Sequence, residues 1–271
     1  MTVKRKWRGE SSVGRSSGKK LQVTRLFAAT LAAGALIVLL TGAMASPVLA
    51  ADAEEQVHGG QPWPDPLESF NDKMFWFNLK LDHYILHPVA QGYADVVPEP
   101  GRRAVGHFFN NIGIVPRFAN DLFQLHWERA AIELTRFGVN TTLGGAGFFD
   151  VADKWFGLKQ QDNDFGMTLG YYGISPGPYL VLPFLGPSTI RDAVGLAADS
   201  SMSPLDWLTP WYIWLPADTG WDVGSAVNYR SLHLNMFEEA DRYAIDLYGA
   251  VQDGYMEKRA AELKAIRFGQ Q

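Results

Sequence analysis

The chain has 271 residues, enough for one or two domains with a substantial core. Its net charge of −5 is uneven: residues 1–50 hold eight Lys or Arg and one Glu (+7), which leaves 16 basic and 28 acidic side chains (−12) in the rest. An acidic body without a basic stripe argues against nucleic acid as a partner, and the lack of any cysteine excludes disulfides, thiolate catalysis, cysteine-type zinc sites and a lipid on an N-terminal cysteine.

The N-terminal 50 residues have the pattern of an export signal. A basic segment precedes an uncharged apolar run at 26–40 and two small-residue cleavage contexts, which end at Ala45 and Ala50. We expect cleavage after Ala50, with Ala45 as the competing site. The alternative is an uncleaved anchor, since residues 26–51 carry no charge and could span a bilayer. Residues 51–65 form an acidic, then Gly/Pro-rich lead-in, and residues 66–264 form the predicted helical domain outside the cytoplasm.

The first predicted helix of the body begins at Asp65, a candidate N-cap, with Pro66 in the first turn. Apolar residues follow at helical spacing in one stripe: Leu67, Phe70, Met74, Phe77 and Leu81. Apolar residues off this stripe indicate burial in a core or in lipid. Asn71 and Asn78 share a face two turns apart, so they either line something polar or cap neighbouring chain ends with their amides.

Further helices are expected from residue 104, from residue 116, at 127–139 and at 148–156, where Asp150 is expected to be solvated. His83 and His87 are spaced like metal ligands on a helix, but zinc needs at least three ligands and no third lies nearby in sequence. The glycines at 144, 145 and 147 could cradle a phosphate, yet the lysine of a phosphate-binding loop is missing. Close helix packing is the better interpretation of these glycines.

Residues 165–187 carry no charge and mix glycines and prolines with apolar side chains. This composition predicts a short apolar hairpin, turned by residues 175–178 with an extended arm at 179–182, or a loop at membrane depth; the two are compatible. The pentapeptide at 173–177 matches the G-x-S-x-G elbow of serine hydrolases around Ser175. Pro176 has no N–H to serve as the oxyanion donor, so Ser175 is predicted to be a turn serine.

The last third of the chain is predicted to be helical. Ser188 is a candidate N-cap for a helix that contains Arg191 and Asp192. Tryptophans at 207, 211 and 214 indicate either an interfacial anchor or a packed aromatic cluster. From residue 221 to about residue 264 the pattern is that of an amphipathic helix.

Several blocks resemble the MlaA (VacJ) family, from about residue 65 to about residue 207. The opening block is Asp-Pro-Leu-Glu-Ser-Phe-Asn-Asp-Lys-Met-Phe-Trp-Phe-Asn at 65–78. Others follow in the family's order: His-Pro-Val-Ala at 87–90, Asn-Asp-Leu-Phe-Gln at 120–124, Thr-Arg-Phe at 135–137, Asn-Thr-Thr-Leu-Gly at 140–144, Gly-Phe-Phe-Asp-Val-Ala at 147–152, Asp-Phe-Gly at 164–166, Thr-Leu-Gly at 168–170, Gly-Pro-Tyr at 177–179 and Arg-Asp at 191–192. The blocks are specific together, though not singly.

The resemblance implies an all-α fold in which amphipathic helices form a ring, with a short apolar hairpin or loop, embedded in the periplasmic leaflet of the Gram-negative outer membrane. It implies a channel that removes mislocalised phospholipid from the outer leaflet. The implied partners are trimeric porins, a periplasmic lipid carrier of the MlaC type and, indirectly, an inner-membrane ABC transporter with an MCE-domain subunit. Many family members carry an N-terminal lipobox cysteine, which this chain lacks, so retention is expected from the body, the porins or an uncleaved N-terminal helix.

The resemblance also indicates candidate site residues. The candidates for the lipid channel and its gate are Phe70, Asn71, Met74, Asn78, Gly166, Leu169, Gly170, Gly173, Gly177 and Pro178. The residues expected to have a structural role in the motif are Asp65, Pro66, Arg191 and Asp192. No catalytic residue, metal or cofactor is predicted. The leading hypothesis is therefore a non-enzymatic phospholipid channel; the alternatives are a scaffolding envelope protein anchored by an aromatic face and a phospholipid hydrolase.

Overall fold

The computed structural model describes residues 63–202, 211–236, 244 and 246–269, and gives only the backbone for 211–219. The predicted signal segment, nearly all of the lead-in and Trp207 lie outside the described residues, as do the side chains of Trp211 and Trp214. The helical elements are α3 Glu68–Leu81, η1 Asp82–Leu86, α4 His87–Val96, α5 Glu99–Ile112, α6 Ile114–Phe123, α7 Trp127–Thr142, α8 Val151–Phe156, α9 Phe165–Tyr171, α10 Ile190–Ser200, α12 Trp211–Leu232 and α14 Leu247–Phe268. Two strands, β1 Tyr179–Leu182 and β2 Gly186–Thr189, complete the described elements.

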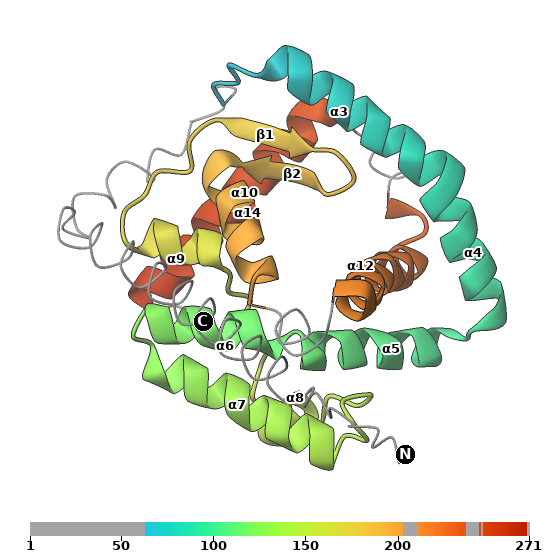
Figure 1. Cartoon of the computed structure of the whole chain (residues 1–271), viewed down its shortest axis with the longest axis vertical. Helices are drawn as coiled ribbons and strands as arrows, with labels where there is room; N and C mark the ends of the chain where they lie inside the picture. Colours follow the sequence, from blue (N-terminus) through green and yellow to red (C-terminus); the bar gives the residue numbers. More distant parts are fainter. Residues whose placement is uncertain (1–62, 203–210, 237–243, 245, 270–271) are drawn as a thin grey trace, which may run out of the picture.

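The helices form a ring (Figure 1). From α3 the chain runs through α4, α5 and α6, and α9, α10 and the β-hairpin close the circle beside α3. Helix α12 packs inside the ring against α4 and α5, α7 and α8 form an outer layer beside α6, and α14 packs on α9 and β2. The predicted all-α ring with a short hairpin is confirmed.

The corner between α3 and α4 is a π-helical turn, which places the carboxylate of Asp82 inside the ring wall. Arg230 of α12 donates to both oxygens of Asp82, at 2.8 and 3.1 Å. Removing either partner would leave a buried charge without its counter-ion, so this pair fixes the corner to α12. Pro88 lies in the first turn of α4, where a missing N–H is tolerated.

The hairpin has its predicted arm but not its predicted turn. β1 pairs antiparallel with β2, from Tyr179 opposite Thr189 to Leu182 opposite Gly186, so residues 183–185 form the turn. The loop at 175–178 instead precedes β1 and is bonded to the start of α10. Arg191 N–H donates to the carbonyl of Pro176 at 3.1 Å, and Ile190 N–H donates to the carbonyl of Pro178 at 3.2 Å. Pro176 and Pro178 have no backbone N–H to donate, but their carbonyls accept these two hydrogen bonds.

The predicted continuous helix from 221 to about 264 is wrong, because α12 ends at Leu232 and α14 begins at Leu247. The side chain of Arg230 accounts for the end of α12, since it donates to the carbonyls of His233 and Leu234 at 2.6 and 2.7 Å. Cationic donors stabilise the free carbonyls at a helix C-terminus.

Three smaller details also differ from the sequence predictions. Thr189, and not Ser188, caps α10 by accepting the N–H of Asp192 at 3.1 Å. Helix α5 begins at Glu99, before the expected residue 104. Asp150 is not solvated, because it caps α8 and pairs with Arg136 at 2.9 Å.

The apolar core of the described residues is divided into small clusters, of which the largest joins Phe75, Tyr179, Val181 and Met256. Many buried side chains are polar, and many large apolar side chains are exposed. Within the described residues, none of the helices combines the length and apolar character needed to cross a membrane.

Candidate functional site

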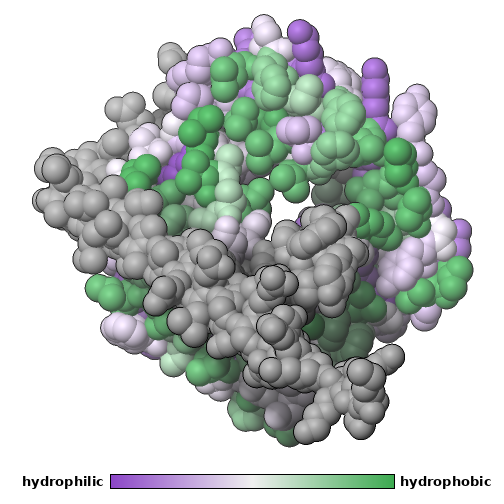
Figure 2. All heavy atoms as spheres, in the orientation of Figure 1, coloured by the Kyte–Doolittle hydropathy of each residue, from purple (hydrophilic) through white to green (hydrophobic). Residues whose placement is uncertain are grey.

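An opening near the middle of the molecule is the candidate site (Figure 2). The hairpin and α10 border it on one side, and α12 lies across from them (Figure 1). Hydrophobic residues gather along its upper edge in the space-filling view. The bordering elements carry exposed apolar side chains: Phe184 and Leu185 in the hairpin turn, Ile190 and Val194 on α10, and Val223 and Tyr229 on α12.

Two asparagine amides attach the hairpin to α3. Asn71 Nδ2 donates to the carbonyl of Tyr179 at 2.9 Å, and Asn71 Oδ1 accepts the N–H of Val181 at 2.9 Å. Asn78 repeats the arrangement near the turn, with the carbonyl of Leu182 at 2.9 Å and the N–H of Phe184 at 2.7 Å. Each amide thus supplies one donor and one acceptor to the backbone of the hairpin, as a neighbouring strand would.

These contacts are close to the second alternative for the asparagines, but the amides bond to the backbone of a hairpin and not to chain ends. Asn71 is fully buried, whereas Asn78 is half-buried. We name the four hydrogen bonds the amide clamp, with an inner half at Asn71 and an outer half at Asn78. A direct contact of either amide with lipid stays a prediction.

Asp65 connects the inner half of the clamp to the C-terminal helix. The predicted N-cap role of Asp65 is wrong, because α3 begins at Glu68 with Leu67 at the N-cap position. Oδ1 of Asp65 accepts the N–H of Leu67 at 3.1 Å, in the turn before the helix, and Asn71 Nδ2 at 2.9 Å. Its Oδ2 accepts the hydroxyl of Tyr248 and Nε2 of Gln252 at 3.4 Å, both on α14. The side chain of Asp65 thus joins the start of α3 to α14 instead of capping α3.

The turn of the hairpin is exposed, apolar and strained. Phe184 has φ +68° although it carries a side chain, and 70% of it is exposed. Such a conformation costs of order 1–3 kcal/mol and persists only where the surroundings hold it. Asn78, the outer half of the clamp, accepts the N–H of Phe184. The ring of Phe184 packs edge-on against the ring of Phe77 on α3, with centroids 5.3 Å apart.

The candidate gate glycines lie in tight packing. Within α9, Gly166 and Gly170 are buried together with Leu169. A Cβ added to Gly166 would lie 2.5 Å from Oδ1 of Asp192, and one added to Gly170 would lie 2.8 Å from Nη1 of Arg191. Both glycines therefore allow close approach of α10.

The glycines that follow α9 serve its end and the approach to β1. Gly173 has φ +89° just after the helix, where its N–H donates to the carbonyl of Gly170 at 2.8 Å. Gly177 has φ +69° next to the exposed Pro178. Only glycine adopts such angles readily, so both positions are constrained by the backbone. Movement of this segment stays a prediction.

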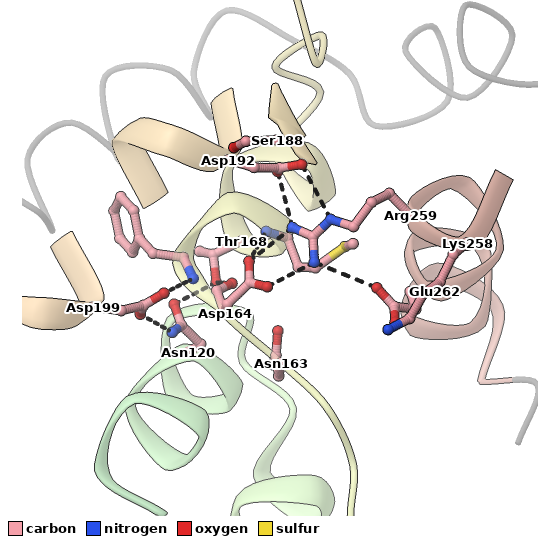
Figure 3. Close-up of polar contacts among 12 residues, drawn as sticks. Asn120, Asn163, Asp164, Thr168, Ser188, Asp192, Asp199, Lys258, Arg259 and Glu262 are labelled. Atoms are coloured by element: carbon pink, nitrogen blue, oxygen red, sulfur yellow. Dashed lines mark hydrogen bonds and ion pairs between the residues drawn. The ribbon is translucent and has the colours of Figure 1, made fainter. Parts of the chain in front are cut away.

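Arg259 of α14 joins three carboxylates from separate elements (Figure 3). It bonds to both oxygens of Asp164 at 2.7 and 3.0 Å, to both oxygens of Asp192 at 3.1 and 2.9 Å, and to Glu262 at 3.4 Å. Arg191 adds a second cation at 3.2 Å from Asp192. Burial alone would raise the pKa of Asp192, but the hydrogen bonds from Arg259 and the charges of Arg191 and Arg259 outweigh burial and lower that pKa.

Asp199 holds the start of α9 from the far end of α10 (Figure 3). Its Oδ2 accepts the N–H of Phe165 at 2.9 Å, and its Oδ1 accepts Nδ2 of Asn120 at 2.8 Å. Burial raises the pKa of Asp199 from 3.8 to about 6, and the nearby charge of Asp164 contributes. Asn120 also accepts the hydroxyl of Thr168, so one polar network connects α6, α9 and α10.

The residues considered for catalysis are not brought together. Ser175 lies in the exposed loop before β1, whereas His83 belongs to the exposed π-turn, with its ring edge-on to Tyr84 at 5.0 Å. The part of the chain that the structure describes contains no group of three or more His, Cys, Asp or Glu able to hold a metal ion.

Sequence reasoning missed Arg259, Asn120 and Asp199. Each lies on a helix whose local pattern is amphipathic, and its partner lies far along the chain, up to 95 residues for Arg259 and Asp164. The N-cap position of Asp164 before α9 was the one local signal in this network.

The family model described as MlaA lipoprotein matches residues 63–262. An uncharacterized protein of Rickettsia felis is 34% identical over 201 residues, 74% of this chain and 78% of the relative. The intermembrane phospholipid transport system lipoprotein MlaA of Escherichia coli is 42% identical over 148 residues, 54% of this chain and 59% of that protein. The protein of that name from Haemophilus influenzae is 31% identical over 210 residues, 75% and 78% of the two chains.

A solved structure described as the structural basis for maintenance of bacterial outer membrane lipid asymmetry has a similar fold. Its TM-score with this chain is 0.64 at 35% sequence identity, and the match covers 74% of this chain and 100% of the other.

Proposed function

Because this chain belongs to the MlaA lipoprotein family, we propose that it is a phospholipid channel of the outer membrane. It takes part in intermembrane phospholipid transport and in the maintenance of outer membrane lipid asymmetry. In this role it removes mislocalised phospholipid from the outer leaflet and passes it to a periplasmic carrier of the MlaC type, which delivers it toward an inner-membrane MCE/ABC transporter.

The observation that carries the channel proposal is the opening in the ring, bordered by the hairpin and by exposed apolar side chains (Figure 2). Moving a phospholipid requires an apolar surface for its chains, and burial of apolar area drives such contacts at about 25 cal/mol per Å². A ring of helices provides that surface without any chemical step. Because lipid movement through the ring requires no bond to be made or broken, this mechanism supports a non-enzymatic role.

The exposed apolar side chains support embedding in the periplasmic leaflet. Soluble proteins rarely expose contiguous apolar patches beyond a few hundred Å². Here large apolar side chains are exposed along α3, the π-turn, α4 and α8: Phe70, Trp76, Phe77, Tyr84, Ile85, Val89, Val96, Trp155 and Phe156. Retention without a lipid-bearing cysteine would then rest on these surfaces and on porin partners.

The hairpin is proposed as the movable border of the opening. Its base is held by the buried inner half of the amide clamp, and its strained turn is held by the half-buried outer half. Water can compete more easily for the bonds of Asn78, so the turn would release before the base. The segment 166–177, with Gly173 and Gly177, leads into the hairpin and remains the second candidate for a moving part of the gate.

Asn78→Ala tests this proposal, with Asn110→Ala on the exposed surface of α5 as the matched control. We expect the Asn78 variant to fold but to fail to restore lipid asymmetry in a strain that lacks the protein. Outer-leaflet phospholipid measured at wild-type level for the Asn78 variant would contradict a role of the hairpin. Gly173→Val is a poor test, because its φ of +89° strains any side chain whether or not the segment moves.

The hydrolase alternative has its own test. Purified protein is expected to release no fatty acid from phospholipid vesicles. Release that Ser175→Ala abolishes would overturn the non-enzymatic proposal.

A further inference from the structure

A cleft of about 400 Å³ lies beside the hairpin, between the lead-in to α3 and the loop before β1. The lead-in to α3 forms one wall, with Trp63, Pro64 and Pro66. The loop before β1 forms the other wall, and α14 contributes Met256 and Ala260. A volume of this size falls within the range of about 300–1,000 Å³ that is usual for small-molecule sites.

The walls are mostly apolar, and their polar side chains are those of Ser175, Tyr179, Thr189 and two arginines. Four of the lining residues are prolines, at 64, 66, 176 and 178, and proline has no backbone N–H. Trp63 and Met256 add large apolar surface, and both pack in the core cluster that contains Tyr179. Such walls suit a hydrocarbon chain better than a polar or charged group.

The two arginines that line the cleft are engaged by protein groups. Arg259 donates through Nε, Nη1 and Nη2 to Asp164, Asp192 and Glu262. Arg191 donates to Asp192 and to the carbonyl of Ile174 at 3.3 Å. Their positive charge is balanced by these carboxylates, so the cleft does not favour a phosphate.

One buried polar group beside the cleft, the hydroxyl of Tyr179, lacks a hydrogen-bond partner. The residue lines the cleft and is 1% exposed, and its buried hydroxyl has no hydrogen-bond partner among the described residues. A buried polar group left unpaired is costly, by about 1–3 kcal/mol. Burial raises the pKa of Tyr179, so the hydroxyl keeps its proton and can donate to a neutral acceptor.

We propose that this cleft binds one acyl chain of a lipid, and that the side chain of Tyr179, whose hydroxyl is buried in this structure, turns toward the chain and donates a hydrogen bond to its carbonyl oxygen. The hydrocarbon lies against Trp63, the prolines and Met256, and the headgroup stays outside. The inference deepens the proposed transport function and rests on it for the source of the lipid. The cleft would be a second lipid-binding site, beside the hairpin, in addition to the path through the ring.

Photocrosslinking of the full-length protein tests the site. The protein is mixed with vesicles of phosphatidylcholine that carries a diazirine on one acyl chain, and adducts are mapped by peptide mass spectrometry. We expect adducts on the cleft face of α14, at Met256 or Ala260. Ala260→Trp fills the cleft and should abolish them, whereas Glu257→Trp, on the exposed face of the same helix, should leave them unchanged.

Tyr179→Phe keeps the ring and removes only the hydroxyl, so it guards against misfolding of the filled variant. Its adduct yield at limiting lipid should fall about fivefold or more if the hydroxyl binds the carbonyl oxygen. A diazirine fatty acid in a parallel reaction distinguishes a free acid from an esterified chain. Stronger labelling by the acid would identify the free acid as the source of the chain and overturn the phospholipid.

The outcomes separate this proposal from the channel. Adducts on exposed side chains of the hairpin turn and α10 that do not line the cleft, namely Phe184, Leu185 and Val194, report on the ring. If those adducts form while α14 is unlabelled, or if Ala260→Trp leaves the α14 adducts unchanged, the cleft proposal is wrong and the channel stands. Labelling of the cleft with a ring that stays unlabelled would instead contradict the channel.

Discussion

At the scale of single residues, Asn71 is the most constrained member of the site. Its amide satisfies a carbonyl and an N–H of β1 and also donates to Asp65, all without contact with water. Asn71→Ala should destabilise the protein by about 2–4 kcal/mol, because it leaves two buried backbone groups unpaired. Asn78→Ala should lower the free energy of unfolding by only about 1 kcal/mol, because water can replace the bonds of the half-buried amide.

Urea unfolding followed by circular dichroism in detergent measures both changes, with Asn110→Ala as the surface control. Equal losses of stability for the Asn71 and Asn110 variants would contradict the clamp.

Asp199 gives the protein a pH dependence that can be isolated. Its folded-state pKa of about 6 lies above the value of 3.8 for an unburied carboxyl, so the folded protein holds the proton more tightly. The contribution of Asp199 to stability therefore increases as the pH falls from about 7 to about 4. Asn at this position cannot titrate.

The stability of the wild type relative to Asp199→Asn should thus grow by roughly 1–2 kcal/mol over this pH range. The measurement is the free energy of unfolding of both proteins at several pH values. A difference that does not change with pH would refute the shifted pKa.

Local sequence signals predicted some of the site residues well and others not at all. The short Asp-Pro sequence at 65–66 predicts the start of α3 to within a few residues, although Leu67 and not Asp65 is the N-cap. Asn71 and Asn78 stand out by their spacing of two turns. The partner of both asparagines, the hairpin, could not be deduced, because it lies more than 100 residues further along the chain. Asp199 has no local signal, since its burial depends on α6 and α9 packing around it.

At the scale of elements, the crossing of α9 and α10 depends on two glycines. A Cβ added to Gly195 would lie 2.3 Å from the backbone N of Gly166, a separation that real Cβ contacts do not show. Gly195→Ala should destabilise the protein by more than about 2 kcal/mol, because the helices must move apart.

Gly92→Ala in α4 is the matched control, since its Cβ would meet nothing within 4 Å. That change should stabilise the helix by about 0.5–1 kcal/mol through propensity alone. A similar gain for the Gly195 variant would show that the helix crossing is looser than described.

The helices themselves follow from amphipathic spacing, and β1 follows from its apolar run between prolines. The position of the hairpin turn does not follow from any local sequence pattern. Prolines and glycine at 175–178 satisfy every local rule for a turn, yet the chain turns at 183–185 because Asn78 and Phe77 hold Phe184 in a strained conformation. The break after Leu232 likewise depends on Arg230, whose other partner, Asp82, lies in the first part of the ring.

At the scale of the whole molecule, Arg259 closes the ring against its C-terminal helix. It joins Asp164, Asp192 and α14, so its loss would leave two carboxylates without their main counter-charge. Arg259→Met should destabilise the protein by about 3 kcal/mol. The neighbouring Lys258→Met removes an exposed cation that pairs with Glu262 and should change stability by less than about 0.5 kcal/mol.

Thermal or urea unfolding of the two variants gives the comparison. Equal effects would mean that α14 is held by its apolar contacts alone. The ring as such was expected from the family resemblance, and nothing in periodicity or composition could have placed α14 behind the hairpin.

The most direct test of the channel is the lipid composition of the outer leaflet in the Gram-negative bacterium that makes this protein. The gene is deleted and then replaced by wild type or by Asn78→Ala, and surface-exposed phospholipid is measured by labelling intact cells. We expect phospholipid to accumulate in the outer leaflet of the deletion strain and wild type to reverse it. An outer leaflet that the deletion leaves unchanged would contradict the account.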